Sequence, residues 1–135
     1  MVTGLHHVGI AVADLEAAIA MHEELGSTVV RRGEFNELDY ALLDCGGAEL
    51  ELLHSADPET AIGKFVAERG PGLHHLAYAV TDLESELSRL LAAGLVQSGE
   101  VRTGIHGTPI VFLHPKSAGG VLTELVEVRD GGRHS

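Results

Sequence analysis

The chain has 135 residues, which is enough for one compact domain but not for two independent ones. Hydrophobic residues make up 44% and charged residues 21%, and no segment approaches the roughly 20 consecutive apolar residues of a membrane span, so we expect a globular protein. Nine Lys and Arg against 20 Asp and Glu give a formal net charge of -11, which argues against nucleic acid or an anionic membrane surface as a partner.

Cys45 is the only cysteine, so the chain has no intrachain disulfide and no zinc site made of four thiolates. We expect it to be a small buried side chain before the Gly46-Gly47 turn. The first residues, MVTGLHHVG, lack the basic and long apolar regions of a signal peptide, which predicts a cytoplasmic location.

An internal repeat organises the sequence. Residues 4–16 read GLHHVGIAVADLE and residues 72–84 read GLHHLAYAVTDLE, with nine of thirteen positions identical at an offset of 68. Each copy begins with an apolar run that suits a strand and continues to an Asp, Asp14 or Asp82, that suits a helix N-cap. We therefore predict two similar halves, each beginning with a strand and a helix.

The predicted helices end at Gly26 and Gly94, which are natural C-terminal stops. Their apolar residues lie close to helical spacing, and we expect them to face the core: Leu15, Ile19 and Leu25 in the first helix, and Leu83, Leu87 and Leu90 in the second.

Short strand-like runs follow each helix. They lie at 28–32, 38–44 and 48–54 in the first half, and at 95–102, 108–114 and 120–128 in the second. The segment from Pro58 to Arg69 is predicted to be a short helix that connects the halves. The chain is thus predicted to be a single α+β domain, 1–135, of two tandem βαβββ modules: module one at about 4–55, a connector at about 56–71 and module two at about 72–128.

Side chains alternate between the two faces of a strand. The bulky faces, Val8, Ile10 and Val12 or Leu76, Tyr78 and Val80, are expected to pack under the helices. The opposite faces carry small residues and one large polar residue each, His7 and His75. A hydrogen-bonded core histidine is the alternative for each, but an inward imidazole repeated in both halves has no evident folding role. His6 and His74 point the other way and are expected to be packing or edge residues.

A second repeat supplies possible partners for these histidines. The segments GGAELELL (46–53) and GGVLTELV (119–126) align Glu51 with Glu124 at an offset of 73. Two carboxylates on inward strand faces are costly unless they bind a positive group. Imidazole and carboxylate ligands suit one divalent ion such as Co, Mn, Ni, Fe or Zn, whereas structural zinc favours thiolates. Glu49 shares the face of Glu51 and is expected to be solvated, with a near-site carboxylate as the alternative.

The paired HH strands, the paired glutamates and the duplicated modules resemble the vicinal oxygen chelate superfamily, also called the glyoxalase/bleomycin resistance superfamily, over nearly the whole chain. Within it, four segments resemble the methylmalonyl-CoA epimerase family: LHHVGIAVADLE, ELELLH at 49–54, GLHHLAYAV at 72–80 and FLHPKSAGGVLTELV at 112–126. The resemblance implies a half-barrel around one divalent metal, held by His7, Glu51, His75 and Glu124.

The resemblance also implies a reaction: epimerisation of (R)- and (S)-methylmalonyl-CoA by removal and return of the C2 proton through a metal-stabilised enolate. Inversion needs acid–base groups on opposite faces of the substrate. Glu124 is the best candidate base. Tyr40 falls where some epimerases have a second catalytic Glu, so Glu51, Glu49, Glu37, Tyr40 or a metal-bound water remain candidates for the opposite face.

Further roles follow from the same resemblance. Ile105, His106 and Gly107 are candidates to bind the substrate carboxylate through backbone N–H groups, and Lys116 is a candidate to contact a CoA phosphate; each can equally be a turn or a solvated residue. Glu51 falls where some relatives have Gln, which adds negative charge at the metal. Half-barrels of this superfamily frequently dimerise, and exposed edge strands favour a homodimer.

Three alternatives remain. A glyoxalase I-type lactoylglutathione lyase shares the four-ligand pattern, but HPK-x-x-GGVL-x-EL departs from the turn usual in glyoxalases. A drug-sequestering binding protein would use aromatic side chains, which make up only 4% of this chain. An extradiol dioxygenase uses two His and one carboxylate and commonly has a longer chain.

Overall fold

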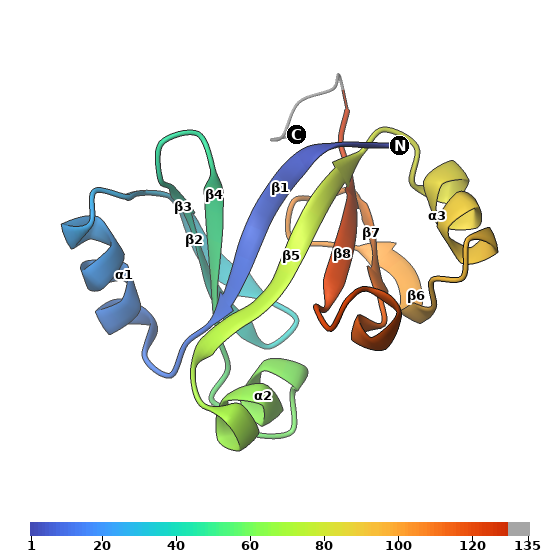
Figure 1. Cartoon of the computed structure of the whole chain (residues 1–135). Helices are drawn as coiled ribbons and strands as arrows, with labels where there is room; N and C mark the ends of the chain where they lie inside the picture. Colours follow the sequence, from blue (N-terminus) through green and yellow to red (C-terminus); the bar gives the residue numbers. More distant parts are fainter. Residues whose placement is uncertain (130–135) are drawn as a thin grey trace. The chain divides into compact units, whose positions relative to one another are not determined.

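The structure is a computed structural model that describes residues 1–129, and it contains eight strands and three α-helices in an α+β arrangement (Figure 1). The first half contains β1 (Val2–Ala11), α1 (Leu15–Glu24), β2 (Thr28–Phe35), β3 (Leu38–Asp44) and β4 (Glu49–His54). A connecting helix, α2 (Ala61–Arg69), follows. The second half contains β5 (Gly72–Val80), α3 (Leu83–Ala92), β6 (Gln97–Thr103), β7 (Pro109–Leu113) and β8 (Thr123–Glu127).

The predicted order β-α-β-β-β in each half is confirmed. One short 3₁₀ helix, Pro115–Ser117, was not expected from the sequence. Among residues 1–129, no helix has both the length and the apolar character needed to cross a membrane.

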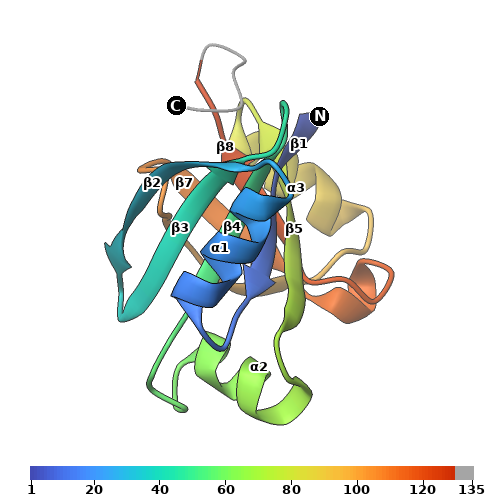
Figure 2. The same ribbon diagram turned by 90° about the vertical axis from the view of Figure 1, so that its left-hand side faces the viewer.

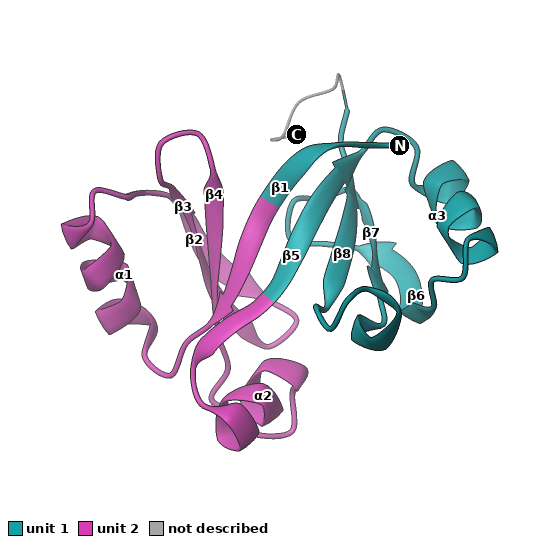
Figure 3. Cartoon of the chain, in the orientation of Figure 1, with its two compact units in different colours: residues 1–6, 75–135 teal, residues 7–74 magenta. Residues whose placement is uncertain are grey.

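The chain divides into two compact units that are interleaved along the sequence (Figure 3). Unit 1 contains residues 1–6 and 75–135, and unit 2 contains residues 7–74. Both β1 and β5 change unit partway along their length. In unit 1 the hydroxyl of Thr3, on the first part of β1, donates to the carbonyl of Ala79 on β5 (3.2 Å).

The strands of unit 2 follow the order β2-β3-β4-β1. β1 and β4 are parallel with Gly9 opposite Glu51, and β3 and β4 are antiparallel with Leu42 opposite Glu51. One face of these strands packs against α1 (Figure 2). The buried residues of this core are Val12, Ile19, Ala41, Leu43 and Leu52, with Ile10, Leu15, Ala18, Val29 and Leu50 partly buried around them.

Unit 1 repeats this arrangement with the order β5-β8-β7-β6 and α3 as the covering helix (Figure 1). Its buried core residues are Val80, Leu83, Val111, Leu113 and Leu125, with Tyr78, Leu87, Leu90 and Leu95 partly buried around them. Full burial of one such side chain is worth roughly 1.5–3 kcal/mol. The helix residues predicted to face the core are confirmed, except Leu25, which caps α1 and is exposed because the helix has already ended. Of the strand residues expected to pack under the helices, Val8 and Leu76 belong to neither of these two cores.

Both main helices begin at the predicted Asp. The Asp14 carboxylate accepts from the backbone N–H of Ala17, and the Asp82 carboxylate accepts from that of Ser85, both at 3.1 Å. Gly26 and Gly94 follow the helices with φ of 106° and 103°, a conformation that favours glycine.

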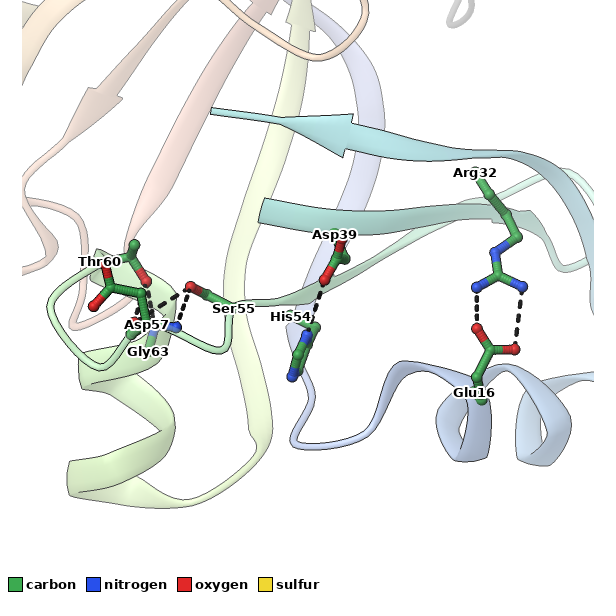
Figure 4. Close-up of polar contacts among 8 residues, drawn as sticks. All are labelled: Glu16, Arg32, Asp39, His54, Ser55, Asp57, Thr60 and Gly63. Carbon is green, nitrogen blue, oxygen red and sulfur yellow. Dashed lines mark hydrogen bonds and ion pairs between the residues drawn. The ribbon is translucent and has the colours of Figure 1, made fainter. Parts of the chain in front are cut away.

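The connecting helix starts at Ala61, three residues later than predicted. Asp57 forms a tight turn in which its carboxylate accepts from Glu59 N–H (2.9 Å) and its carbonyl accepts from the Thr60 hydroxyl (2.9 Å; Figure 4). Thr60 then caps the helix by accepting from Gly63 N–H (3.0 Å). A Cβ at Gly63 would lie 2.0 Å from the Asp57 carbonyl oxygen, so the turn and the helix require glycine there.

The expectation that Cys45 is buried is wrong, because its side chain is exposed. β3 ends at Asp44, whose carboxylate accepts from the N–H groups of Gly46 and Gly47 at 3.1 and 3.0 Å. Cys45 therefore lies in the turn rather than in the strand.

We expect Asp14→Ala and Asp82→Ala each to lower the free energy of unfolding by about 1 kcal/mol, the usual value of an N-cap side chain. Equilibrium urea denaturation measures the loss. Asp→Asn at either position keeps an acceptor oxygen and should restore most of it. A loss at one position only would contradict the structural equivalence of the two caps.

The Glu86 carboxyl on α3 should make the free energy of unfolding depend on pH. Hydrogen bonds from Arg89 (3.1 and 2.6 Å) lower the pKa of its carboxyl to about 2, although the side chain is only 3% exposed. Because the folded pKa lies below the unfolded value, the stabilisation is complete above about pH 4.5 and is lost as the pH falls towards 2.

Glu86→Gln should therefore lower the free energy of unfolding at pH 7 by about 1–2 kcal/mol, a value reduced to allow for the half-exposed Arg89. The difference from wild type should shrink steadily below pH 4 in urea denaturation. An equal difference at pH 7 and pH 3 would contradict the role of the carboxylate charge.

Candidate functional site

In unit 2 the structure brings together a buried imidazole and a buried carboxylate. His7 on β1 is 1% exposed and Glu51 on β4 is 5% exposed. His7 Nε2 lies 3.3 Å from Glu51 Oε2. The two side chains meet because β1 and β4 are parallel neighbours with Gly9 opposite Glu51, so that His7, two residues before Gly9, shares its face.

Unit 1 contains a second pair with the same construction. His75 on β5 is 4% exposed, Glu124 on β8 is 6% exposed, and His75 Nε2 lies 3.1 Å from Glu124 Oε1. Ala77 lies opposite Glu124, so His75 again precedes the partner of the glutamate by two residues. The ring of Phe112, which is opposite Glu124 on β7, meets the His75 ring edge-on at 5.5 Å.

The chemistry of these pairs suits a divalent cation. A carboxylate hidden from water costs free energy unless a positive group or hydrogen bonds compensate for its charge. Imidazole nitrogens and carboxylate oxygens are ligands that Mn, Co, Ni and Zn accept, and neither pair contains a thiolate. Each pair, with one imidazole nitrogen and one carboxylate, therefore offers the kind of ligands that such an ion accepts.

Tyr40 lies on the same face of unit 2 as Glu51. Tyr40 is opposite Leu53, and Leu42, two residues further along β3, is opposite Glu51. The Tyr40 ring is buried across Gly33 on β2, where an added Cβ would lie 2.9 Å from the phenol oxygen. The Arg31 guanidinium is 5.7 Å from the ring centroid. Tyr40 is thus buried on the face that carries His7 and Glu51.

The expectation that Glu49 is solvated is wrong, because Glu49 is buried. Its position two residues before Glu51 on one strand was the sequence signal for the alternative, a near-site carboxylate. His6 and His74, expected to be packing or edge residues, each contact an aromatic ring. His6 is buried and meets the ring of His106 edge-on at 4.5 Å, and His74 meets the ring of Phe65 at 5.0 Å.

The predicted substrate-binding loop joins β6 to β7. Gly107 N–H donates to the carbonyl of Gly104, and Gly104 N–H donates to the carbonyl of Thr108, both at 3.0 Å. These bonds close a tight turn around Ile105 and His106. Gly104 packs closely, since an added Cβ there would lie 2.8 Å from the side chain of Ile110.

Lys116 lies in the short 3₁₀ helix before β8, with an exposed side chain. Its backbone N–H donates to His114 Nδ1 (3.1 Å). Ser117 ties this helix to the start of β6, because its hydroxyl accepts from Val96 N–H (2.9 Å) and donates to the His114 carbonyl (2.8 Å). The lysine is thus held on an ordered turn with its ammonium group in solvent.

Unit 2 also contains an open cavity of about 660 Å³ that the sequence did not indicate. Polar pairs on its wall are Arg32 with Glu16, which form a two-point ion pair, and His54 with Asp39 at 3.3 Å (Figure 4). Tyr40 and Gly33 belong to the same wall, whereas neither His7 nor Glu51 lines it.

Comparison with known proteins identifies the family. The family model described as Glyoxalase/Bleomycin resistance protein/Dioxygenase superfamily matches residues 3–112. The chain is 39% identical over 137 residues to the ethylmalonyl-CoA/methylmalonyl-CoA epimerase of Cereibacter sphaeroides, covering 95% of this chain and all of that protein. It is 36% identical to the human mitochondrial methylmalonyl-CoA epimerase, covering 90% of this chain and 72% of that protein.

Solved structures agree with this result. The crystal structure of methylmalonyl-CoA epimerase from Mycobacterium tuberculosis matches with a TM-score of 0.88 and 43% identity over 95% of this chain and 89% of that one. A methylmalonyl-CoA epimerase in complex with methylmalonyl-CoA and NH4+ matches with a TM-score of 0.87 and 31% identity over 96% and 97%. The chain belongs to the Glyoxalase/Bleomycin resistance protein/Dioxygenase superfamily and, within it, to the methylmalonyl-CoA epimerases.

Proposed function

We propose that this protein is a divalent-metal-dependent epimerase that interconverts (R)- and (S)-methylmalonyl-CoA by removing and returning the proton at C2. The observation that carries this proposal is the pair of buried His–Glu contacts, His7 with Glu51 and His75 with Glu124, in a chain related to epimerases over its whole length. Relatives solved with methylmalonyl-CoA or with 2-nitronate-propionyl-CoA support an acyl-CoA thioester as the substrate.

His7, Glu51, His75 and Glu124 would hold one divalent ion, with Co, Mn, Ni and Zn as the candidates. When bound, the ion supplies Lewis-acid stabilisation of negative charge on the thioester and carboxylate oxygens of the substrate. The superfamily's wide use of metal ions and the chemistry of the four ligands support this assignment, and the identity of the ion stays a prediction.

Glu124 is the proposed base on one face of the substrate. Its Oε1 lies 3.1 Å from His75 Nε2, and the side chain is buried. Phe112 packs against His75, restricts rotation of the imidazole ring and keeps water from one side of it.

Glu51 is the proposed acid–base group on the opposite face. Its Oε2 is held by His7 Nε2, so it is oriented in the same way as Glu124. Tyr40 is the alternative, because it lies on the same face of unit 2 as Glu51. Two groups are needed because the proton must leave one face of C2 and return to the other.

Ile105 and His106 are proposed to bind the substrate carboxylate. The backbone N–H of Gly107, also a candidate from the sequence, instead donates to the Gly104 carbonyl and closes the turn. The exposed side chain of Lys116 is proposed to contact a CoA phosphate. The chain is also proposed to form a homodimer, because β2 and β6 end the strand orders of their units. Its cytoplasmic location stays a prediction.

The decisive assay follows hydrogen at C2 of methylmalonyl-CoA in deuterium oxide. With a suitable divalent ion the protein should convert one epimer to the other and introduce deuterium at C2, which NMR detects, and chelation should abolish both. No exchange with Co, Mn, Ni or Zn would reject the proposal. Methylglyoxal with glutathione serves as the control for a glyoxalase and should give no lactoylglutathione.

Glu124→Gln and Glu51→Gln should separate the two proton transfers. Each variant should lose at least 100-fold in epimerisation, within the usual contribution of a general acid–base group. Each should retain exchange at C2 for only one epimer, opposite in the two variants. If Tyr40→Phe, rather than Glu51→Gln, shows this one-sided exchange, the second base is Tyr40.

Metal content distinguishes loss of a base from loss of a ligand. His7→Ala and His75→Ala should each release most of the bound ion, as elemental analysis of dialysed protein would show. His74→Ala, which removes an imidazole that packs on Phe65, is the matched control and should retain the ion. Full metal content in both His7→Ala and His75→Ala would exclude the proposed ligand set.

A further inference from the structure

Thr108 carries a buried hydroxyl for which the fold provides no partner. The residue is 5% exposed, and its Oγ1 has no hydrogen-bond partner among residues 1–129. A hydroxyl left in this state typically costs about 1–3 kcal/mol, and native proteins rarely retain one without a reason. Valine has nearly the same shape and would avoid this cost.

The position of Thr108 places it on the catalytic face of unit 1. On β7, Phe112 is opposite Glu124, and Ile110 is opposite Val126. Side chains alternate along a strand, so the series 112, 110 and 108 continues along the face that carries Glu124. Thr108 directly precedes β7 and follows the loop proposed to bind substrate. Its carbonyl accepts from Gly104 N–H (3.0 Å), which continues the pairing of Thr103 with Pro109 by one position.

Two features restrain the backbone around Thr108. Its carbonyl accepts from Gly104 N–H (3.0 Å), and the following residue is Pro109, whose ring restricts the backbone. Gly104 in turn packs against Ile110. A donor that is oriented before the ligand arrives loses little conformational freedom on binding.

We propose that the Thr108 hydroxyl donates a hydrogen bond to an oxygen of the bound acyl-CoA thioester. The proposal rests on the proposed function, which places C2 of the substrate beside Glu124. The four residue steps from Phe112 to Thr108, three of them within β7, span at most roughly 13 Å. The oxygen is therefore either at the acyl end of the substrate or an amide carbonyl of the pantetheine arm.

The test compares Thr108→Val, which removes only the hydroxyl, with Thr108→Ser, which keeps it. Thr103→Val is the matched control, because it makes the same change at an exposed position of β6. Isothermal titration of the metal-loaded protein with methylmalonyl-CoA and with free CoA gives the dissociation constants, and thermal denaturation gives Tm for every variant.

Thr108→Val should raise the dissociation constant for methylmalonyl-CoA about three- to tenfold, the range expected for one neutral hydrogen bond. KM should rise to a similar extent with kcat within twofold, and Tm should be unchanged or higher. Thr108→Ser and Thr103→Val should bind like wild type. An equal loss with free CoA assigns the bond to the pantetheine arm, and a loss confined to methylmalonyl-CoA assigns it to the acyl end.

Three results would overturn the proposal. The first is unchanged binding of methylmalonyl-CoA by Thr108→Val, and the second is a loss of affinity in Thr108→Ser as large as that in Thr108→Val. The third is a marked fall in Tm of Thr108→Val, which would show that the hydroxyl stabilises the fold.

Failure of the proposed function has a different signature. Wild type would then bind CoA without exchanging the C2 proton, and the effect of Thr108→Val on CoA binding would still be measurable. Wild type that binds neither compound would reject both proposals.

Discussion

The structure depends on keeping two carboxylates out of water beside two imidazole rings. Glu51 and Glu124 are both buried, and each contacts a histidine that is itself buried. Imidazole contacts offset only part of the cost of burying a carboxylate, so the arrangement favours a bound cation. The strand pairing and the helices that cover the opposite face serve this constraint, because they fix the positions of the four side chains.

The duplication gives both pairs the same geometry. In unit 2, Glu51 lies opposite Gly9 on the parallel strand β1, and His7 is two residues before Gly9. In unit 1, Glu124 lies opposite Ala77 on the parallel strand β5, and His75 is two residues before Ala77. Aspartate caps on the two equivalent helices then anchor the covering layer in the same way in both halves.

The surroundings of the two pairs differ. Leu42 lies opposite Glu51, whereas Phe112 lies opposite Glu124. Two residues from these positions, unit 2 has Tyr40 and unit 1 has Ile110. Each unit therefore repeats the His–Glu pair but surrounds it with different side chains on the adjacent strand.

The sequence by itself determined the βαβββ order of both halves, the helix starts at Asp14 and Asp82, and the inward direction of the repeated His and Glu residues, because strand alternation, helix caps and duplication are local properties of the chain. The contacts His7–Glu51 and His75–Glu124 needed the strand register, which joins residues more than 40 positions apart. Burial was likewise decided by tertiary structure: Glu49 is covered and Cys45 is exposed, against expectation, because solvent access depends on the segments that pack around a residue. The unpartnered hydroxyl of Thr108 follows from the same cause, since only the folded chain determines which polar groups lie within hydrogen-bonding distance of one another.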